Sequence, residues 1–61
     1  MKWTTLSEFY YRDSTSRFDV MMRADWVWVA YDCVHPRRGE FHSLTAAKEW
    51  CSERAKNYTE G

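Results

Sequence analysis

The chain of 61 residues predicts one small domain, residues 1–61, near the lower size at which a single hydrophobic core keeps a protein folded. Nine basic and nine acidic residues give a formal net charge of zero, which argues against a dedicated nucleic-acid-binding protein because such domains carry a positive excess. Four tryptophans, four tyrosines and three phenylalanines offset the small size, since each ring can bury roughly 150–250 Å².

The sequence carries no signal for export or for membrane insertion. Met1–Glu8 lacks the apolar segment of a signal peptide, and the longest apolar stretch, Trp26–Val34, is too short to cross a bilayer. We therefore expect a cytoplasmic protein without membrane contact. Cys33 and Cys51 are expected to be free thiols, because disulfides are rare in reducing compartments.

A hairpin at Arg17–Val34 is the main predicted element. Val, Phe, Trp and Tyr dominate this segment and suit half-buried strands, and Ala24-Asp25 is predicted to be its two-residue loop. A preceding strand is expected at Glu8–Arg12, ended by the polar turn Asp13–Ser16. Trp3–Leu6 is expected to be a short lead-in that packs against an edge of the core.

The last third of the chain predicts a loop followed by a helix. His35–Glu40 contains a proline and a glycine, which end the sheet. Ser43 is a favourable N-cap for a helix from Leu44 to about Asn57, with Lys48 on its solvent side. The apolar stripe expected to cover the inner sheet face is Leu44, Ala47, Cys51, Ala55 and Tyr58.

The predicted fold is therefore α+β, a three-stranded antiparallel β-meander with one C-terminal α-helix packed on one face (β-β-β-α). The two-residue loop sets the register, with Met22 opposite Val27 and Val20 opposite Val29. The inward face is then Phe18, Val20, Met22, Val27, Val29, Tyr31 and Cys33, joined by Phe9 and Tyr11. The outward face carries Asp19, Ala30 and Asp32 together with Tyr10, Arg12, Arg17, Met21, Arg23, Trp26 and Trp28.

The outward face is the predicted partner-binding surface, formed by Tyr10, Arg12, Arg17, Met21, Arg23, Trp26 and Trp28. A single helix covers only one face of a sheet, and monomers rarely expose an apolar patch of this size. Trp, Tyr, Met and Arg are enriched at interface cores, so a protein partner or a second copy of the chain is expected. The plainer alternative is a half-exposed sheet whose arginine stems lie over the rings.

No pattern in the sequence indicates catalysis or a cofactor. Cys33, His35, His42 and Cys51 are competent metal ligands, but their spacing matches no compact zinc motif. No motif places a nucleophile beside an oriented base, and a chain this short has little room for a water-excluding cleft. We therefore expect neither an enzyme nor a metal site, and no small-molecule substrate.

The segment from Gly39 to Lys48 has the form G-x-F-x-S-L-x-x-A-K and follows Trp28–Tyr31. Over roughly residues 26–51 the chain resembles small accessory proteins of bacteriophages and prophages, in which a meander runs into a glycine turn and a closing helix. This resemblance implies a bacterial cytoplasmic setting and a non-enzymatic accessory role.

A more distant resemblance is to the three-stranded-sheet-plus-helix DNA-binding domains of some phage integrases. It implies, as the alternative function, that the same sheet face binds duplex DNA through Arg12, Arg17, Arg23, Trp26 and Trp28, with Arg37 and Arg38 on the flanking backbone. Asp19 and Asp32 depart from that pattern, because phosphates would repel both.

Overall fold

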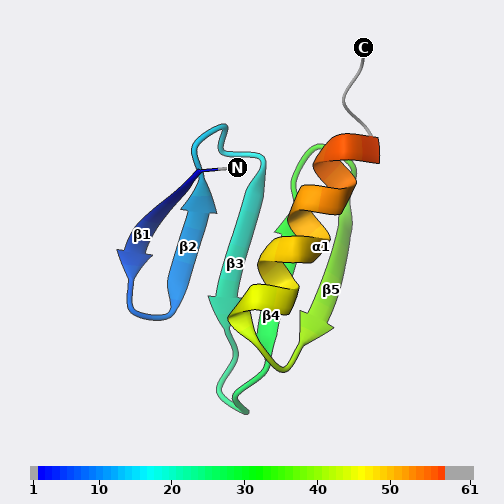
Figure 1. Cartoon of the computed structure of the whole chain (residues 1–61). Coiled ribbons are helices and arrows are strands. Elements are labelled where there is room, and N and C mark those ends of the chain that lie inside the picture. The colour runs from blue at the N-terminus through cyan, green and yellow to red at the C-terminus, as the bar shows by residue number, and fades with distance from the viewer. Residues whose placement is uncertain (1, 58–61) are drawn as a thin grey trace.

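The computed structural model describes residues 2–57, which form one antiparallel sheet and one helix (Figure 1). Five strands pair in chain order, and a C-terminal helix follows them. The elements are β1 (Trp3–Ser7), β2 (Tyr10–Asp13), β3 (Phe18–Met22), β4 (Trp28–Asp32), β5 (Arg37–Phe41) and α1 (Leu44–Asn57). The α+β class, the antiparallel meander and the C-terminal helix are confirmed, whereas the predicted number of three strands is wrong.

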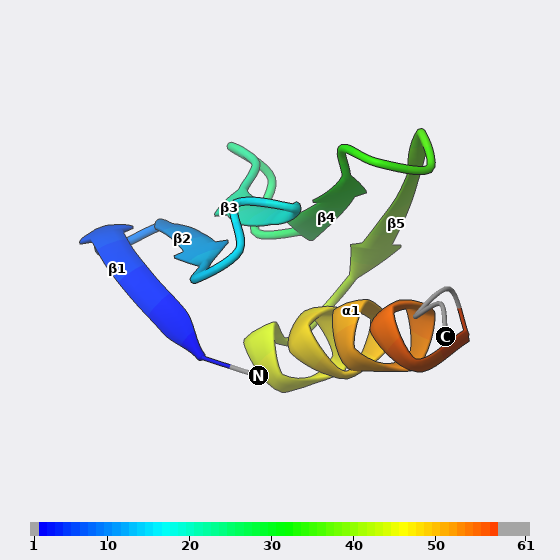
Figure 2. The ribbon, with the colours of Figure 1, turned by 90° about the horizontal axis from the view of Figure 1, so that it is seen from above.

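The helix lies across β3, β4 and β5 and covers one face of the sheet (Figure 2). Its core consists of Phe18, Val20, Ala30, Ala47 and Cys51, which are almost fully buried. The three small residues among them let the helix approach the sheet closely. Ser43 Oγ accepts a hydrogen bond from the Ala46 N–H at 3.1 Å, so the predicted N-cap and helix bounds are confirmed. Tyr58 lies outside the described residues.

Lys48 connects the helix to the β1–β2 side of the sheet, which α1 does not cover. Its Nζ lies 4.7 Å from the ring centroid of Tyr11 and 5.6 Å from that of Trp3. A cation over aromatic faces is attracted by the ring quadrupole. Lys48 was expected on the solvent side, but its stem and charge shield the two rings instead.

Both additional strands are the edges of the sheet. β1 was expected to be a lead-in and β5 part of a loop, because neither is a run of apolar residues. Edge strands do not need such a run, and charged residues suit them. The rings of Phe41 and Trp50 pack closely against Gly39 in β5. A Cβ at this position would come within 2.6 Å of the Phe41 ring and 3.3 Å of Trp50, so the strand favours glycine here.

The β3–β4 hairpin differs from its predicted register by one residue. Met22 pairs with Trp28 and Val20 pairs with Ala30. The loop contains three residues rather than two, because the Arg23 N–H donates to the Val27 carbonyl at 2.8 Å. Within it the Trp26 N–H donates to the Arg23 carbonyl at 3.1 Å, and Trp26 has a φ of 67°. This is the common three-residue hairpin loop, in which a turn is followed by a left-handed residue.

The shift by one residue exchanges the two faces of β4. Trp28, Ala30 and Asp32 point to the helix side, because they pair with the inward residues Met22, Val20 and Phe18. The predicted inward orientation of Val29, Tyr31 and Cys33 is therefore wrong. By contrast, β2 and β3 pair two residues away from the predicted register, with Tyr11 opposite Val20, so their faces are unchanged.

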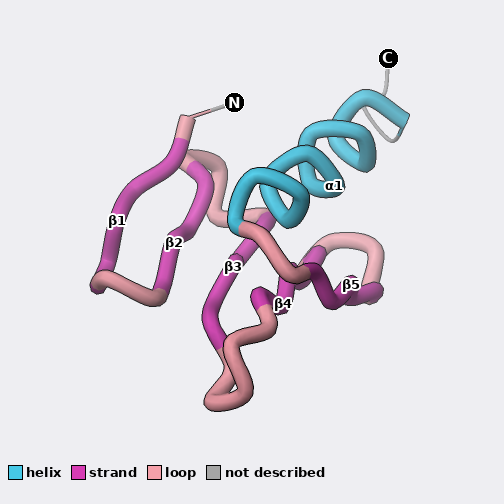
Figure 3. The backbone as a smooth tube through the Cα atoms, turned by 60° about the horizontal axis from the view of Figure 1, so that its bottom comes forward, coloured by secondary structure: helices cyan, strands magenta, loops and turns pink. Residues whose placement is uncertain are grey.

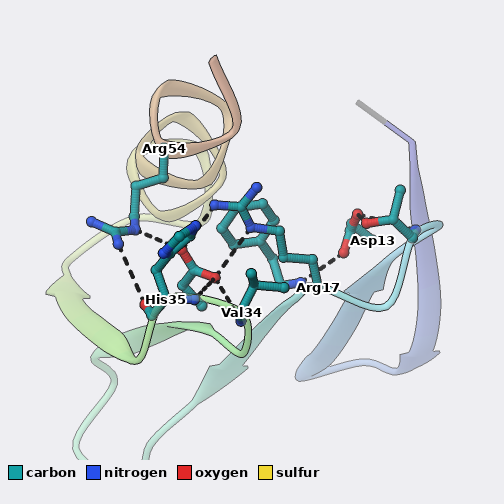
Figure 4. Close-up of polar contacts among 8 residues, drawn as sticks. Asp13, Arg17, Val34, His35 and Arg54 are labelled. Atoms are coloured by element: carbon teal, nitrogen blue, oxygen red, sulfur yellow. Dashed lines mark hydrogen bonds and ion pairs between the residues drawn. The ribbon is translucent and has the colours of Figure 1, made fainter. Parts of the chain in front are cut away.

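Asp32 ties the helix to the sheet beneath the β4–β5 turn through Arg17 and Arg54, which Figure 4 labels together with Val34 and His35. Its side chain is fully buried and accepts hydrogen bonds from Arg17 Nε and Nη2, both at 3.2 Å, and from Arg54 Nε at 2.9 Å. The N–H groups of Val34 and His35 donate to the same carboxylate at 3.0 and 3.1 Å. Burial acts to raise the pKa of Asp32, but the hydrogen bonds from Arg17 and Arg54 outweigh it and hold the pKa well below its ordinary value.

Asp13 plays a similar part at the β2–β3 turn. It is 3% exposed and accepts hydrogen bonds from the Phe18 N–H at 2.7 Å, from the Thr15 N–H at 3.1 Å and from the Thr15 hydroxyl. Burial acts to raise the pKa of Asp13, and these hydrogen bonds lower it below the ordinary value. Both buried carboxylates thus organise turns at the same end of the sheet.

We predict that Asp32→Asn lowers the free energy of unfolding by about 3–5 kcal/mol, because it removes the buried negative charge that the largely buried guanidinium groups of Arg17 and Arg54 share. The stabilisation by Asp32 is present above the unfolded-state pKa of about 3.9 and is lost as pH falls below it, since folding lowers the pKa. Urea denaturation between pH 2 and 7 should therefore show that the free energy of unfolding falls less steeply toward low pH in the variant than in the wild type. Asp25→Asn, at an exposed pair, is the matched control; equal losses in both variants would contradict this role.

Candidate interaction surface

The face of the sheet that α1 leaves uncovered is here called the outer sheet face. It carries both polar and apolar side chains, and four of the seven predicted partner-binding residues lie on it or at its margin. Its members are Tyr10, Arg12, Asp19, Met21, Arg23, Val29, Tyr31, Cys33, Arg38 and Glu40.

Ion pairs occupy two arginines of this face. Arg12 Nε donates to Asp19 Oδ1 at 2.8 Å, and its Nη2 donates to the Tyr10 hydroxyl at 2.7 Å. Arg23 binds Asp25 at 2.7 Å and Glu40 at 2.8 Å. These pairs are solvent-exposed or partly so and contribute little stability, but they neutralise charge that a polyanion would need.

An open hollow of ≈ 610 Å³ lies on the outer sheet face beside the β4–β5 turn. Its lining combines acidic, basic and less polar side chains, among them Asp19, Met21, Tyr31, Asp32, Cys33, Arg37 and Arg38. The Cys33 thiol points to Asp19 Oδ2 at 3.8 Å. Burial and the charge of Asp19 raise the pKa of Cys33, so the thiolate is disfavoured and the geometry does not support a nucleophile.

The most exposed aromatic residues lie at one end of the sheet, where the β1–β2 turn and the β3–β4 loop project together (Figures 1 and 3). Trp26 is 73% exposed and Phe9 is 44% exposed. They line a common hollow of ≈ 220 Å³ with Met22, Arg23 and Ala24. We call the apolar members of this hollow, Phe9, Met22, Ala24 and Trp26, the aromatic end.

Two of the predicted partner-binding residues are partly buried on the helix side of the sheet instead. Trp28 points to the helix side, with its ring centroid 6.5 Å from that of Phe9 and 6.0 Å from that of Tyr11. Arg17 holds the buried Asp32 carboxylate. Trp26 is exposed as expected, but it belongs to a loop and not to a strand.

Phe9 belongs to this surface although it was expected at an inward strand position. Phe9 lies in the turn between β1 and β2, and this position leaves its ring exposed. Arg37 and Arg38 lie in β5 and not in a loop, so they point to opposite faces of the edge strand.

Charge is segregated along the sheet although the net charge is zero. At the end with the β2–β3 and β4–β5 turns, six basic described residues outnumber three acidic ones; we call this the basic end. Its members are Lys2, Arg17, Arg37, Arg38, Arg54 and Lys56, with Asp13, Asp32 and Glu53. Around the aromatic end, three acidic residues, Glu8, Asp25 and Glu40, outnumber the one basic residue among the described residues there, Arg23.

The described residues place no three His, Cys, Asp or Glu side chains close enough together to hold a metal ion. Cys33 on the outer sheet face and Cys51 in the core beneath the helix are both free. Burial raises the pKa of the Cys51 thiol to about 12. The helix found among residues 2–57 is not long and apolar enough to cross a membrane.

Comparisons of the chain with protein-family models, with curated protein sequences and with solved structures give no match.

We predict that Trp28→Ala lowers the free energy of unfolding by about 3 kcal/mol, because the indole packs against Phe9 and Tyr11 on the helix side. Thermal and urea denaturation, followed by far-UV circular dichroism, would measure the loss. Trp26→Ala is the matched control and should leave the midpoint nearly unchanged, because the indole is exposed. A Trp28→Ala variant as stable as the wild type would instead place this indole on the outer sheet face.

Proposed function

We propose that the protein is a non-enzymatic binding module that engages a protein partner through its aromatic end, with Trp26 as the anchor. The observation that carries this proposal is the combination of 73% exposure and positive φ at one tryptophan. The outer sheet face beside it, with Tyr10, Arg12, Met21 and Arg23, would form the surrounding polar rim.

The backbone conformation of Trp26 is unfavourable for its own side chain. A left-handed conformation costs an L-residue other than glycine roughly 1–2 kcal/mol, and glycine or asparagine would fit the loop more easily. Burial does not offset this cost, because most of the indole is in contact with solvent. The three-residue loop requires a left-handed backbone at this position but not an indole, and strained residues cluster at functional sites, so we infer that the indole serves recognition.

The surroundings of Trp26 suit a binding anchor. Phe9 and Met22 form an apolar floor with it, and tryptophan and methionine are enriched at interface cores. Arg23 lies at the rim, held by Asp25 and Glu40. The acidic excess at this end favours a partner segment with an apolar side chain flanked by basic residues.

The contacts favour this proposal over the binding of DNA by the outer sheet face. Arg12, Arg17 and Arg23 are all hydrogen-bonded to carboxylates, and a phosphate would have to displace those partners. Trp28, which the resemblance to integrase domains would place against DNA, packs on the opposite face.

Trp26→Gly separates folding from binding at this position. Glycine relieves the strained backbone, so we predict that the variant is more stable than the wild type by about 1 kcal/mol while losing its partner. Denaturation midpoints measure the first effect. A photo-crosslinking aromatic residue at position 26, introduced in cells that make the protein, measures the second, with the same group at the exposed helix position Glu53 as control.

The proposal expects one dominant crosslinked product at position 26 that is absent at position 53; a product of twice the chain mass would identify the partner as a second copy. Destabilisation by Trp26→Gly, or the same crosslinked products from both positions, would contradict it.

A further inference from the structure

The basic end contains a polar pocket on the helix side of the sheet, separate from the aromatic end. It has a volume of ≈ 230 Å³ and is lined by His35, Pro36, Arg37 and Arg54. None of the described residues that line it carries a carboxylate. Its walls come from the β4–β5 turn, the start of β5 and the C-terminal half of α1.

Arg37 has an unusual electrostatic position in this pocket. It lies directly across the ladder from Asp32, the natural counter-charge, yet it forms no ion pair with any described residue. Within residues 2–57 its guanidinium donates one hydrogen bond, a long one of 3.5 Å to the Pro36 carbonyl.

The saturation of Asp32 explains why the cross-strand pair does not form. A carboxylate has about four lone-pair sites, and Asp32 already accepts five hydrogen bonds from Arg17, Arg54 and two backbone N–H groups. The N–H groups of Arg37 can therefore donate to a ligand. The hydrogen bonds to Asp32 that stabilise the fold are the reason why this guanidinium has no carboxylate partner among the described residues.

Arg54 is held in a fixed orientation beside the pocket. Its Nε donates to Asp32 at 2.9 Å, and its Nη2 donates to the His35 carbonyl at 3.4 Å (Figure 4). A guanidinium whose plane is already fixed loses less side-chain entropy when it binds an anion.

From these contacts we propose that the pocket of His35, Arg37 and Arg54 binds a phosphate monoester group. The Arg37 guanidinium supplies N–H donors to this pocket, whose wall also carries the positive charge of Arg54, and arginine matches the geometry of phosphate oxygens. The surrounding excess of positive charge at the basic end, with Arg38 on the far side of β5, would attract such an anion. The small volume suits a single phosphoryl group rather than a polyanion.

The test is an NMR titration of the ¹⁵N-labelled protein with inorganic phosphate, with chloride adjusted to keep the ionic strength constant. We expect saturable shifts of the backbone N–H groups of residues 35–38 (Pro36 has none) and of the Nε–H groups of Arg37 and Arg54. Arg37→Ala should weaken phosphate binding roughly tenfold or more, and Arg37→Lys should weaken it less. Arg12→Ala removes an arginine paired with Asp19 and should change nothing, which makes it the matched control.

Parallel titrations with adenosine monophosphate and with a short DNA duplex distinguish the sources of the phosphate. Binding of inorganic phosphate and of the monoester at the same residues, both dependent on Arg37, supports the proposal. Shifts that do not saturate, equal binding by Arg37→Ala, or binding of the duplex alone would overturn it. The outcome is independent of Trp26, so it tests this pocket and not the proposed protein-binding function.

Discussion

The length of the β3–β4 loop is the constraint on which the rest of the structure depends. Three residues between Arg23 and Val27, instead of two, set the pairing of β3 with β4. That register turns Trp28, Ala30 and Asp32 toward the helix. The helix then packs on the small side chain of Ala30, and the Asp32 carboxylate meets Arg17 and Arg54 in the interior. The same loop places Trp26 in a left-handed conformation in solvent.

Much of the fold could be predicted from the sequence because its signals are local. Ser43 and the helical spacing after it gave the correct bounds of α1, and alternation gave the correct faces of β2 and β3. The face of β4 could not be predicted, since tryptophan is a poor indicator of a left-handed loop residue and a two-residue loop was the simpler assumption. The edge strands lack apolar runs because edges need none.

The residue types of the candidate site could be predicted from the sequence, but the face of the sheet on which each side chain lies could not. Trp26 was identified as an exposed aromatic, yet Trp28 and Arg17 were assigned to the wrong side. Arg17 and Arg54 lie 15 and 22 residues from Asp32 in sequence, so no local pattern shows that they share one carboxylate. The two ends of the sheet differ in the side chains that they present. One end presents exposed aromatic residues in an acidic setting, with Trp26 in a strained backbone conformation, and the other presents arginines whose nearby carboxylate is saturated.

The register of the β3–β4 hairpin is the central structural claim, and NMR measures it directly. Arg17 with Cys33 and Arg23 with Val27 are hydrogen-bonded pairs, so Val20 and Ala30 form a non-hydrogen-bonded pair with closely spaced Cα atoms. The account predicts a strong nuclear Overhauser effect between the Hα atoms of Val20 and Ala30. A strong effect between the Hα atoms of Val20 and Val29 instead would show the two-residue loop. It would turn Trp28 outward and contradict both the buried Asp32 network and the aromatic end as described.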